Sequence, residues 1–240
     1  MIVALLTAAG TGTRMHQNVP KQFIHVSNKP IIVHTMEAFQ CHPSVDAILV
    51  VTLKSWTEVL RAYANQFGIT KLRWIVPGGE TNQESIRNGI LKLKGEFLDE
   101  NITVIVHDGN RPLVTSEIIS DNLATFAKYG SAVAVVPCTD VIFESDNGFS
   151  SHTSTEREKL FRTQTPHTYH LNDLVQAHEE AQKRGIKGTA ASCMLMKELG
   201  HESYFSKGSE ENIKITTMDD LRIFKALLRI RQYDRIEDGR

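Results

Sequence analysis

The residues best suited to bind a phosphate chain follow the first apolar segment of the sequence. The segment Ala8–Met15 reads Ala-Ala-Gly-Thr-Gly-Thr-Arg-Met. Its glycines, Gly10 and Gly12, allow a tight backbone turn that presents N–H groups to phosphate oxygens. Arg14 and Lys21 add two cations that could neutralise a triphosphate. A tight strand-to-loop turn with solvated cations explains the same residues, so both interpretations stay open on the loop alone.

The loop differs from two familiar phosphate-binding motifs. In the dinucleotide fingerprint G-x-G-x-x-G the third glycine would stand at Met15. A P-loop would continue with Gly-Lys-Ser/Thr, and this sequence does not. The pattern therefore favours neither a nicotinamide dinucleotide site nor a P-loop.

A second group of chemically capable residues, His107–Pro112, closes an apolar run. Ligands of α/β proteins bind outside the carboxyl ends of strands, so this position favours a binding site. The Asp108 carboxylate could help to hold Mg²⁺ on phosphates, and Arg111 could face an anion. An ion pair between Asp108 and Arg111 that only fixes the loop is the alternative.

Two further segments give weaker signals. Pro77–Glu80 precedes a capped helix and could offer backbone donors to a base or a phosphate. Lys214 lies between Ile213 and Ile215 in a predicted short strand, where a lysine usually extends to solvent. The ten histidines show no metal-binding spacing, and no serine or cysteine has a triad context. A covalent mechanism is not indicated.

The segments that would position these residues alternate between strand and helix patterns. Thr81 with Glu84, and Ser55 with Glu58, are predicted capping boxes. The alternation predicts an α/β fold with a Rossmann-like, doubly wound and mostly parallel sheet. The five β-branched runs predicted as buried strands are Ile2–Thr7, Ala47–Thr52, Leu72–Val76, Ile102–Val106 and Ser131–Val136. Further helices are predicted at Ser116–Tyr129, Asn172–Lys183, Ala190–Leu199 and after Thr217.

The pattern changes after Pro137. Val141–Glu144, then Asp146-Asn147-Gly148 and a polar Ser/Thr stretch predict a hairpin that leaves the main body. We therefore expect one domain from residues 1–137 and 168–232, a protruding arm at 138–167 and a polar tail at 233–240.

Bulk composition narrows the class of partner. The 240 residues are 41% hydrophobic and 23% charged, as in ordinary globular proteins. Lys and Arg number 27 against 28 Asp and Glu, so no global field favours nucleic acid, and a small partner is expected. Three widely spaced cysteines indicate reduced thiols and a cytoplasmic protein. No apolar stretch approaches the ~20 residues of a membrane span.

Taken together, the ordered motifs resemble the 2-C-methyl-D-erythritol 4-phosphate cytidylyltransferases and their relatives, the ribitol-5-phosphate cytidylyltransferases. The resemblance covers nearly the whole chain and implies a nucleotidyltransferase-type sheet. It rests on Ala8–Met15, Pro20-Lys21-Gln22, Gly78-Gly79 with Ser85, His107-Asp108 with Arg111-Pro112, Arg157 with Leu160, Gln164-Thr165-Pro166 and Asn212–Thr216.

The resemblance also implies a role for each motif, with Arg14, Lys21 and Lys214 as the catalytic cations. It places the nucleotide at Ala8, Ala9, Gly10, Thr11, Gly12, Gly79, Glu80, Ser85, Asp108 and Gly109. It places the acceptor phosphate at Asp108, Arg111, Thr189 and Lys214, with Arg157 and Thr165 supplied by a partner subunit. A homodimer joined through the arm is therefore expected.

The expected chemistry agrees with the missing catalytic triad. A phosphate monoester has its second pKa near about 6, so its oxygen is already ionised and can attack without a general base. Attack on the α-phosphorus of CTP brings anions together, and Mg²⁺ with the three cations would offset their repulsion. The site would thus bind CTP, a divalent cation such as Mg²⁺, and a small sugar or polyol phosphate. Asp108 is the candidate metal contact.

Several positions depart from the family pattern. The family usually has arginine at Asn82, an acid at Ala190, glutamine at His167 and an alanine-led pair at Gly109-Asn110. Ala8-Ala9-Gly10 and the spacing of Arg157 and Leu160 favour methylerythritol phosphate, in isoprenoid precursor synthesis, as the acceptor. Ribitol phosphate or another polyol phosphate, for surface polymer synthesis, is the alternative. A nucleotide-binding module without turnover is a third hypothesis.

Overall fold

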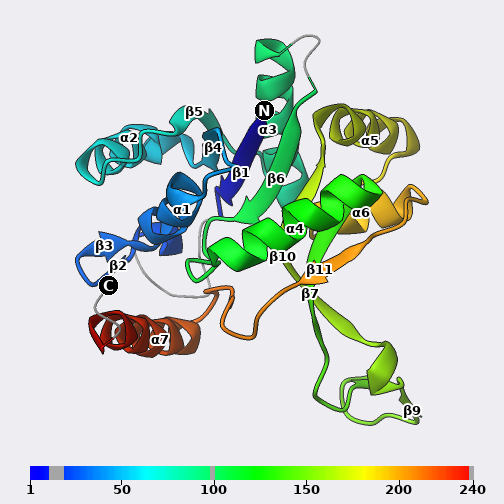
Figure 1. Ribbon diagram of the computed structural model, residues 1–240. Coiled ribbons are helices and arrows are strands. Elements are labelled where there is room, and N and C mark those ends of the chain that lie inside the picture. Colours follow the sequence, from blue (N-terminus) through cyan, green and yellow to red (C-terminus); the bar gives the residue numbers. More distant parts are fainter. Residues whose placement is uncertain (11–18, 98–100, 238–240) are drawn as a thin grey trace.

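A mostly parallel sheet forms the centre of the molecule (Figure 1). The computed structural model describes residues 1–10, 19–97 and 101–237, and beyond Arg231 it describes the side chain of Tyr233 alone. Within these residues seven strands run in the order β11-β7-β10-β6-β1-β4-β5. They are β1 (Ile2–Ala8), β4 (Ala47–Thr52), β5 (Leu72–Pro77), β6 (Thr103–Asp108), β7 (Ser131–Pro137), β10 (Phe161–His170) and β11 (Phe205–Lys207). β10 is antiparallel to β6 and β7, and the other pairs are parallel.

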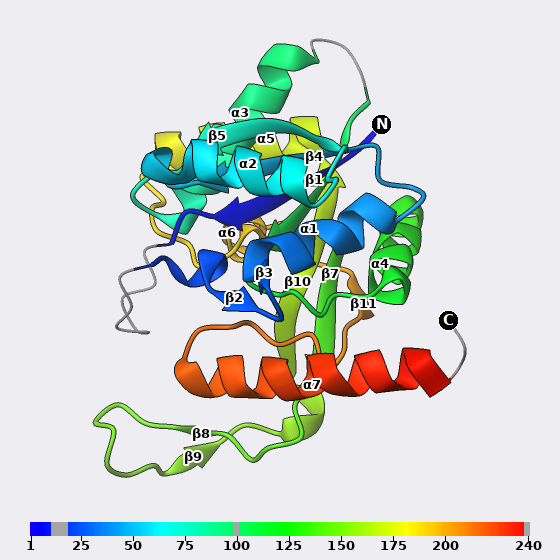
Figure 2. The same cartoon turned by 90° about the vertical axis from the view of Figure 1, so that its left-hand side faces the viewer.

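Helices cover both faces of this sheet (Figures 1 and 2). Side chains alternate along a strand, so β1 serves two cores: Val3 and Leu5 pack toward α3, α5 and α6, and Ala4 and Leu6 pack toward α1, α2 and α4. The helices are α1 (Ile31–Cys41), α2 (Thr57–Gln66), α3 (Asn82–Glu96), α4 (Ser116–Tyr129), α5 (Leu171–Arg184), α6 (Ser192–Glu198) and α7 (Met218–Glu237). The predicted α/β fold is confirmed, and all five predicted strands form; four of them are buried, but β5 lies at the edge of the sheet and is only partly buried or exposed along its length.

Two elements near the site were not predicted from the sequence. α1 begins with Ile31-Ile32-Val33, and β-branched residues lower helix propensity. Burial of this segment in the core overrides that preference, since all three side chains are fully buried. β10 contains Pro166 and many polar residues, yet seven of its ten positions are buried or partly buried between β6 and β7.

The two predicted capping boxes have different outcomes. Thr81 caps α3 by accepting a hydrogen bond from the Glu84 backbone N–H at 3.1 Å. The Ser55–Glu58 box does not form, because residues Lys54–Trp56 make a 3₁₀ turn and α2 starts only at Thr57 without a side-chain cap. The N-cap of α2 is therefore Trp56, one residue after the predicted Ser55.

The predicted hairpin is present and extends from the body (Figure 2). β8 (Phe143–Glu144) pairs with β9 (Thr153–Ser154), and Gly148 lies in the turn at φ +72°. The arm ends earlier than predicted: residues from Phe161 onward pair with β7 in the central sheet, so the expected boundary at residue 167 lies inside β10. The protruding segment is therefore residues 139–160.

The C-terminal segment also differs from the prediction of a polar tail from residue 233. α7 continues through Glu237, and its Leu221 and Phe224 are buried against Ile31 and Leu113. Residues 238–240 lie outside the described part of the chain. In the described part, no helix has the length and apolar character needed to cross a bilayer. The three cysteines are free, as expected.

Candidate active site

Two adjoining cavities open where β1, β5 and β6 end. The first, of about 170 Å³, is lined by most of the residues predicted to bind nucleotide. They are Ala8, Ala9, Gly10, Gly79, Glu80, Ser85 and Asp108, together with Lys21 and Lys214. The second cavity, of about 220 Å³, shares Thr7, Asn82, Asp108 and Lys214 with the first. The structure thus brings together residues that are 200 positions apart in the sequence.

The start of the glycine loop is held by close backbone packing and by a buried amide. A Cβ on Gly78 would stand 2.2 Å from the Cβ of Ala9, so the ends of β1 and β5 approach too closely for any side chain there. The Gln22 side chain is buried, and its Nε2 donates to the carbonyl oxygens of Ala8 at 2.5 Å and Gly10 at 3.2 Å. Gln22 therefore fixes the loop from below, a role that sequence reasoning did not assign.

The first turn of α3 forms the opposite wall of the first cavity. The Gly79 N–H donates to Ser85 Oγ at 3.1 Å, and the Glu80 N–H donates to Glu84 Oε2 at 2.8 Å. A Cβ on Gly79 would meet the Cβ of Glu84 at 2.4 Å, which requires glycine at this close approach. Ser85 and Glu84 thus occupy backbone donors of the loop and hold it in one conformation.

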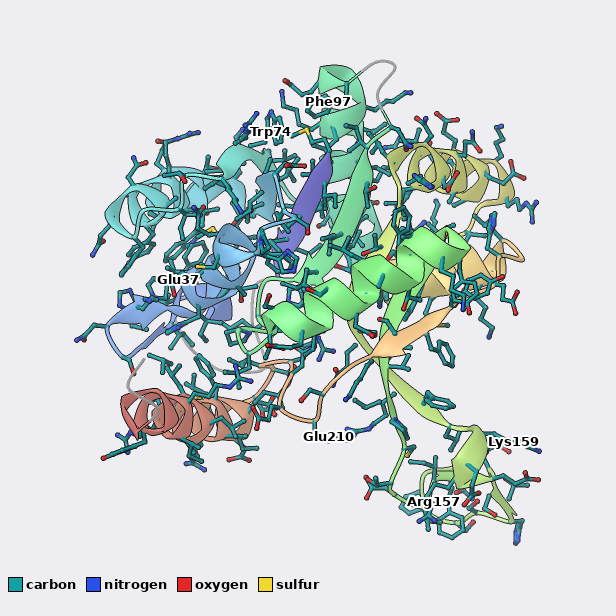
Figure 3. The ribbon with its side chains drawn as sticks, in the orientation of Figure 1. Glu37, Trp74, Phe97, Arg157, Lys159 and Glu210 are labelled. Carbon is teal, nitrogen blue, oxygen red and sulfur yellow. The ribbon has the colours of Figure 1, made fainter. Side chains whose placement is uncertain are left out.

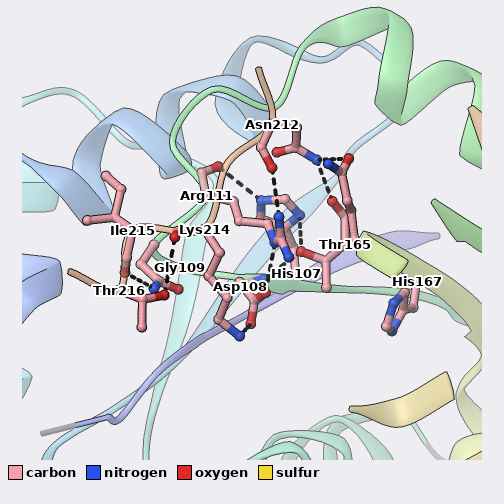
Figure 4. Close-up of polar contacts among 12 residues, drawn as sticks. His107, Asp108, Gly109, Arg111, Thr165, His167, Asn212, Lys214, Ile215 and Thr216 are labelled. Carbon is pink, nitrogen blue, oxygen red and sulfur yellow. Dashed lines mark hydrogen bonds and ion pairs between the residues drawn. The ribbon is translucent and has the colours of Figure 1, made fainter. Parts of the chain in front are cut away.

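Asp108 forms ion pairs with two cations at the junction of the cavities (Figure 4). Its Oδ2 accepts from Arg111 Nε at 2.9 Å and its Oδ1 accepts from Lys214 Nζ at 2.9 Å. Burial alone would raise the pKa of this carboxyl, but the charges and hydrogen bonds of Lys214 and Arg111 lower it well below its ordinary value. The two cations and one anion leave a local excess of positive charge.

The two cations differ in how they are held. The Arg111 side chain is 11% exposed, and its Nη1 also donates to the Asn212 carbonyl at 2.7 Å. The Lys214 side chain is 43% exposed. Lys214 was predicted to lie in a short strand, but residues 213–216 have no regular secondary structure, and the Ile215 N–H bonds to the Asn110 carbonyl. Its ammonium group nevertheless points inward to Asp108 rather than to solvent.

A buried hydrogen-bond chain supports the backbone of Asp108 (Figure 4). Thr165 Oγ1 accepts from the Asp108 N–H at 3.0 Å and lies 3.0 Å from His107 Nδ1. His107 Nε2 lies 3.2 Å from the Arg111 carbonyl, which can only accept, so the proton is on Nε2 and Thr165 donates to Nδ1. Burial lowers the pKa of His107 to about 3, which keeps the ring neutral.

Thr165 lies at the second cavity of its own chain, where its hydroxyl contacts Asp108. It is held there because β10 belongs to the central sheet and not to the arm. Its expected contribution to the active site of a partner subunit stays a prediction. Arg157, the other residue expected in a partner's site, lies exposed on the arm in η4 (Arg157–Lys159) (Figure 3), and it lines neither cavity.

Three other expectations have mixed outcomes. Gly109 does not line either cavity; its N–H bonds to the Thr7 carbonyl at 2.8 Å, and a Cβ there would meet that oxygen at 2.9 Å. Thr189 is buried, and both its N–H and its hydroxyl donate to Gln83 Oε1, so it supports the wall without lining a cavity. Thr11, Gly12 and Arg14 lie outside the described residues.

Asn82 is a cavity residue that the sequence comparison with the family placed near the site as a departure, without assigning it a role. It lines both cavities, and its Nδ2 donates to the Ala190 carbonyl at 3.0 Å. Two of the departures from the family pattern are therefore in direct contact. The sequence already marked Asn82 and Ala190 as departures from the family pattern. Only the fold shows that both residues lie on the wall of the second cavity.

The donor set bears on where a metal could bind. Among the residues that the structure describes, no three His, Cys, Asp or Glu side chains gather as metal ligands. Asp108 and Glu80 are the carboxylates on the first cavity. Mg²⁺ commonly binds through one or two carboxylates plus substrate phosphates and waters. The residues present fit a cation of that kind, held mainly by a bound triphosphate.

Comparisons with known proteins agree with this geometry. Residues 2–230 match the family model of 2-C-methyl-D-erythritol 4-phosphate cytidylyltransferase (IspD). The ribitol-5-phosphate cytidylyltransferase of Lacticaseibacillus paracasei is 39% identical over 95% of this chain and 98% of its own length. The 2-C-methyl-D-erythritol 4-phosphate cytidylyltransferase of Clostridium botulinum (strain ATCC 19397 / Type A) is 37% identical over 93% and 96%.

Solved structures share the fold. The crystal structure of 4-diphosphocytidyl-2C-methyl-D-erythritol synthase from Anaerococcus prevotii superposes with a TM-score of 0.80 at 21% identity, covering 95% of this chain and 98% of that one. The match of the family model over residues 2–230 and the identities above 30% decide the assignment. The chain belongs to the IspD family of cytidylyltransferases, which are nucleotidyltransferase enzymes.

Proposed function

We propose that this cytidylyltransferase joins ribitol 5-phosphate to CTP, releasing pyrophosphate and forming CDP-ribitol. One observation supports a reaction between two substrates: Asp108 and Lys214 line both cavities. This pair of charges can therefore face the triphosphate of CTP and the phosphate of the acceptor at the same time. The choice of acceptor rests on relatives. Two relatives named ribitol-5-phosphate cytidylyltransferase, at 39% and 38% identity, share slightly more residues with this chain than the methylerythritol phosphate enzyme of C. botulinum at 37%, while those of Streptococcus agalactiae share 34%.

This choice replaces the acceptor that the sequence motifs favoured. Methylerythritol phosphate was preferred on Ala8-Ala9-Gly10 and on the arm, which are features of the loop and of a segment remote from the second cavity. Asn82 and Ala190, by contrast, lie on the cavity wall itself. Neutral residues at both positions suit a neutral polyol chain, which ribitol 5-phosphate and methylerythritol 4-phosphate share, so the choice of ribitol rests on the relatives.

The described residues divide into three tasks in this proposal. Gly10 and Lys21 would face the phosphates of CTP, and Glu80 with the Gly79–Ser85 pair would surround the base. Lys214 would stabilise the charge that develops as the acceptor phosphate oxygen attacks the α-phosphorus. No protein base is needed, because that oxygen is already ionised at neutral pH. We also propose that Arg14 binds the phosphates of CTP, as the family resemblance implied.

Mg²⁺ is proposed as the divalent cofactor. Asp108 and Glu80 would hold it, and it would supply charge neutralisation on the phosphates of CTP. The chain's own contribution is to keep Asp108 ionised, through Lys214 and Arg111, at any neutral pH.

The arm is proposed to join two copies of the chain. It carries large apolar side chains in water: Phe143 is 67% exposed and Phe149 is 96% exposed. Exposed apolar groups gathered on a protruding hairpin are typical of a surface that another protein covers. Arg157 on the same arm would then face the partner's site. Light scattering of the intact chain should give a dimer mass, and Phe149→Ser with Phe143→Ser should give a monomer of reduced activity.

Pyrophosphate release tests the proposed reaction. We expect release with CTP, Mg²⁺ and ribitol 5-phosphate, much less with methylerythritol 4-phosphate, and little with ATP or UTP in place of CTP. Lys183 is exposed and lines neither cavity, so a Lys183→Ala variant is the control for the loss of release expected when Lys21 or Lys214 is replaced by alanine. Release with methylerythritol 4-phosphate alone would reject the proposed acceptor. CTP binding without release for any acceptor would support the module that lacks turnover.

A further inference from the structure

The second cavity contains a buried histidine nitrogen that has no partner. His167, on β10, is only 2% exposed and is one of the residues lining this cavity. Its Nδ1 lies 2.9 Å from Ser192 Oγ. Its Nε2 is itself covered and has no hydrogen-bond partner among the described residues, while the His167 ring forms part of the cavity wall. Figure 4 shows the ring beyond Thr165, separate from the chain that links His107 to Asp108.

An unsatisfied buried nitrogen in a polar cavity indicates a ligand group. Buried polar groups are nearly always hydrogen-bonded, and one left without a partner costs free energy. The same cavity holds Arg111 and Lys214, which suit a phosphate. It therefore offers a charged region for the phosphate end of an acceptor and a neutral polar atom, His167 Nε2, for another part of the molecule.

The charge state of His167 selects the kind of group. Burial lowers the pKa of this imidazole to about 4, so the ring is neutral at neutral pH. The Ser192 hydroxyl can either donate to Nδ1 or accept from it, so Nε2 can be a donor or an acceptor. A hydroxyl group is both donor and acceptor and matches either tautomer. A second phosphate oxygen would find no charge at this nitrogen.

We propose that His167 is a specificity-determining residue whose Nε2 binds a hydroxyl group of the polyol phosphate acceptor, with Ser192 orienting the ring. This inference rests on the proposed function, because it takes the second cavity as the acceptor site. It names a direct contact that distinguishes a hydroxylated acceptor from one that lacks the hydroxyl at that position.

Three variants test the contact through the Michaelis constants of the two substrates. His167→Leu removes the nitrogen, and His167→Gln places an amide group near the position of Nε2. His178→Leu is the matched control, because His178 is also buried with unpartnered nitrogens but lies on α5, outside both cavities. Thermal unfolding of each variant reports whether the fold is retained.

We expect His167→Leu to raise the KM of ribitol 5-phosphate roughly three- to tenfold, the effect of one lost hydrogen bond, and to leave the KM of CTP unchanged. His167→Gln should recover part of the loss, and His178→Leu should show none. A set of monodeoxy ribitol 5-phosphates identifies the contacted hydroxyl. The KM of His167→Leu should exceed that of wild type for every analogue except the one that lacks this hydroxyl.

Two results would overturn the inference. One is an equal penalty for His167→Leu with ribitol 5-phosphate and with every deoxy analogue, which a purely structural role would give. The other is an unchanged KM for the acceptor in a folded variant. Failure of the proposed function is distinguishable, because it shows in wild type as no release with ribitol 5-phosphate. In that case the same comparison is made with methylerythritol 4-phosphate, which also carries hydroxyl groups.

Discussion

Buried histidines should make this protein sensitive to mild acid, and three of the four buried in the described part of the chain have the most strongly lowered pKa values. His107, His167 and His178 are each at most 3% exposed. Burial lowers their pKa values to about 3, about 4 and about 4, from an ordinary value of 6.5. Because the unfolded chain binds these protons more readily than the folded chain, stability is complete above pH 6.5 and falls as the pH drops toward the folded values.

The size of the effect follows from the shifts. Each pKa unit corresponds to about 1.36 kcal/mol, so at pH 5 each histidine removes about 2 kcal/mol from the free energy of unfolding. The three together remove about 6 kcal/mol, which is comparable with the whole stability of an ordinary domain. Asp108 acts at lower pH: its pKa is lowered, so the stability it contributes is lost only below its ordinary value near 3.8.

Urea unfolding at pH 7.5, 6.0, 5.5 and 5.0 measures the dependence. We expect the free energy of unfolding of wild type to fall by about 4 kcal/mol per pH unit near pH 5. His178→Leu removes one titrating group that lies outside the site, so its slope should be smaller by about 1.4 kcal/mol per pH unit. Equal slopes for wild type and His178→Leu, or no change in wild type between pH 7.5 and 5.0, would refute the reasoning.

The remaining predictions concern the site. Lys21→Ala should lower kcat about 100- to 1000-fold without unfolding the protein, and near-normal pyrophosphate release would reject its phosphate role. Lys214→Ala should lower kcat/KM by a similar factor and raise the pKa of Asp108, which loses one of its two cations; an unchanged pH–rate profile together with full activity would contradict this. Thr165→Val should cost about 1–3 kcal/mol of stability in urea, because the Asp108 N–H and His107 Nδ1 lose their shared partner; a neutral effect would mean that the buried chain is unimportant.

The sheet could be predicted from the sequence where local pattern and burial agree. β1 and β4 are continuous apolar runs because both of their faces are covered, which is what the sequence pattern indicated. β10 could not be predicted in this way. Its polar residues, such as Thr165 and His167, are buried because they bond to residues that are distant in the chain, and this compensation has no local signature.

The sequence predicted many of the residues that line the cavities, but not the contacts between them. From the sequence, an ion pair between Asp108 and Arg111 was the alternative to a binding role. The ion pair is present, and both residues also line the second cavity. The Lys214 contact spans 106 positions and depends on how residues 212–216 cross the end of β6. Asn82 and Ala190 are 108 positions apart, so their hydrogen bond could be found only in the folded chain.

The arrangement around Asp108 explains why the two cations need not be equivalent. Arg111 is buried and committed to Asp108 and to the Asn212 carbonyl, so its planar guanidinium fixes the carboxylate in place. Among the side chains that the structure describes, Lys214 bonds to Asp108 alone, and 43% of the Lys214 side chain is exposed. An arriving phosphate can therefore share the ammonium group of Lys214 without breaking the buried pair. In the proposed function, Asp108 would act as the anchor from which Lys214 reaches substrate, so that the charge needed in the transition state would be positioned before the substrate binds.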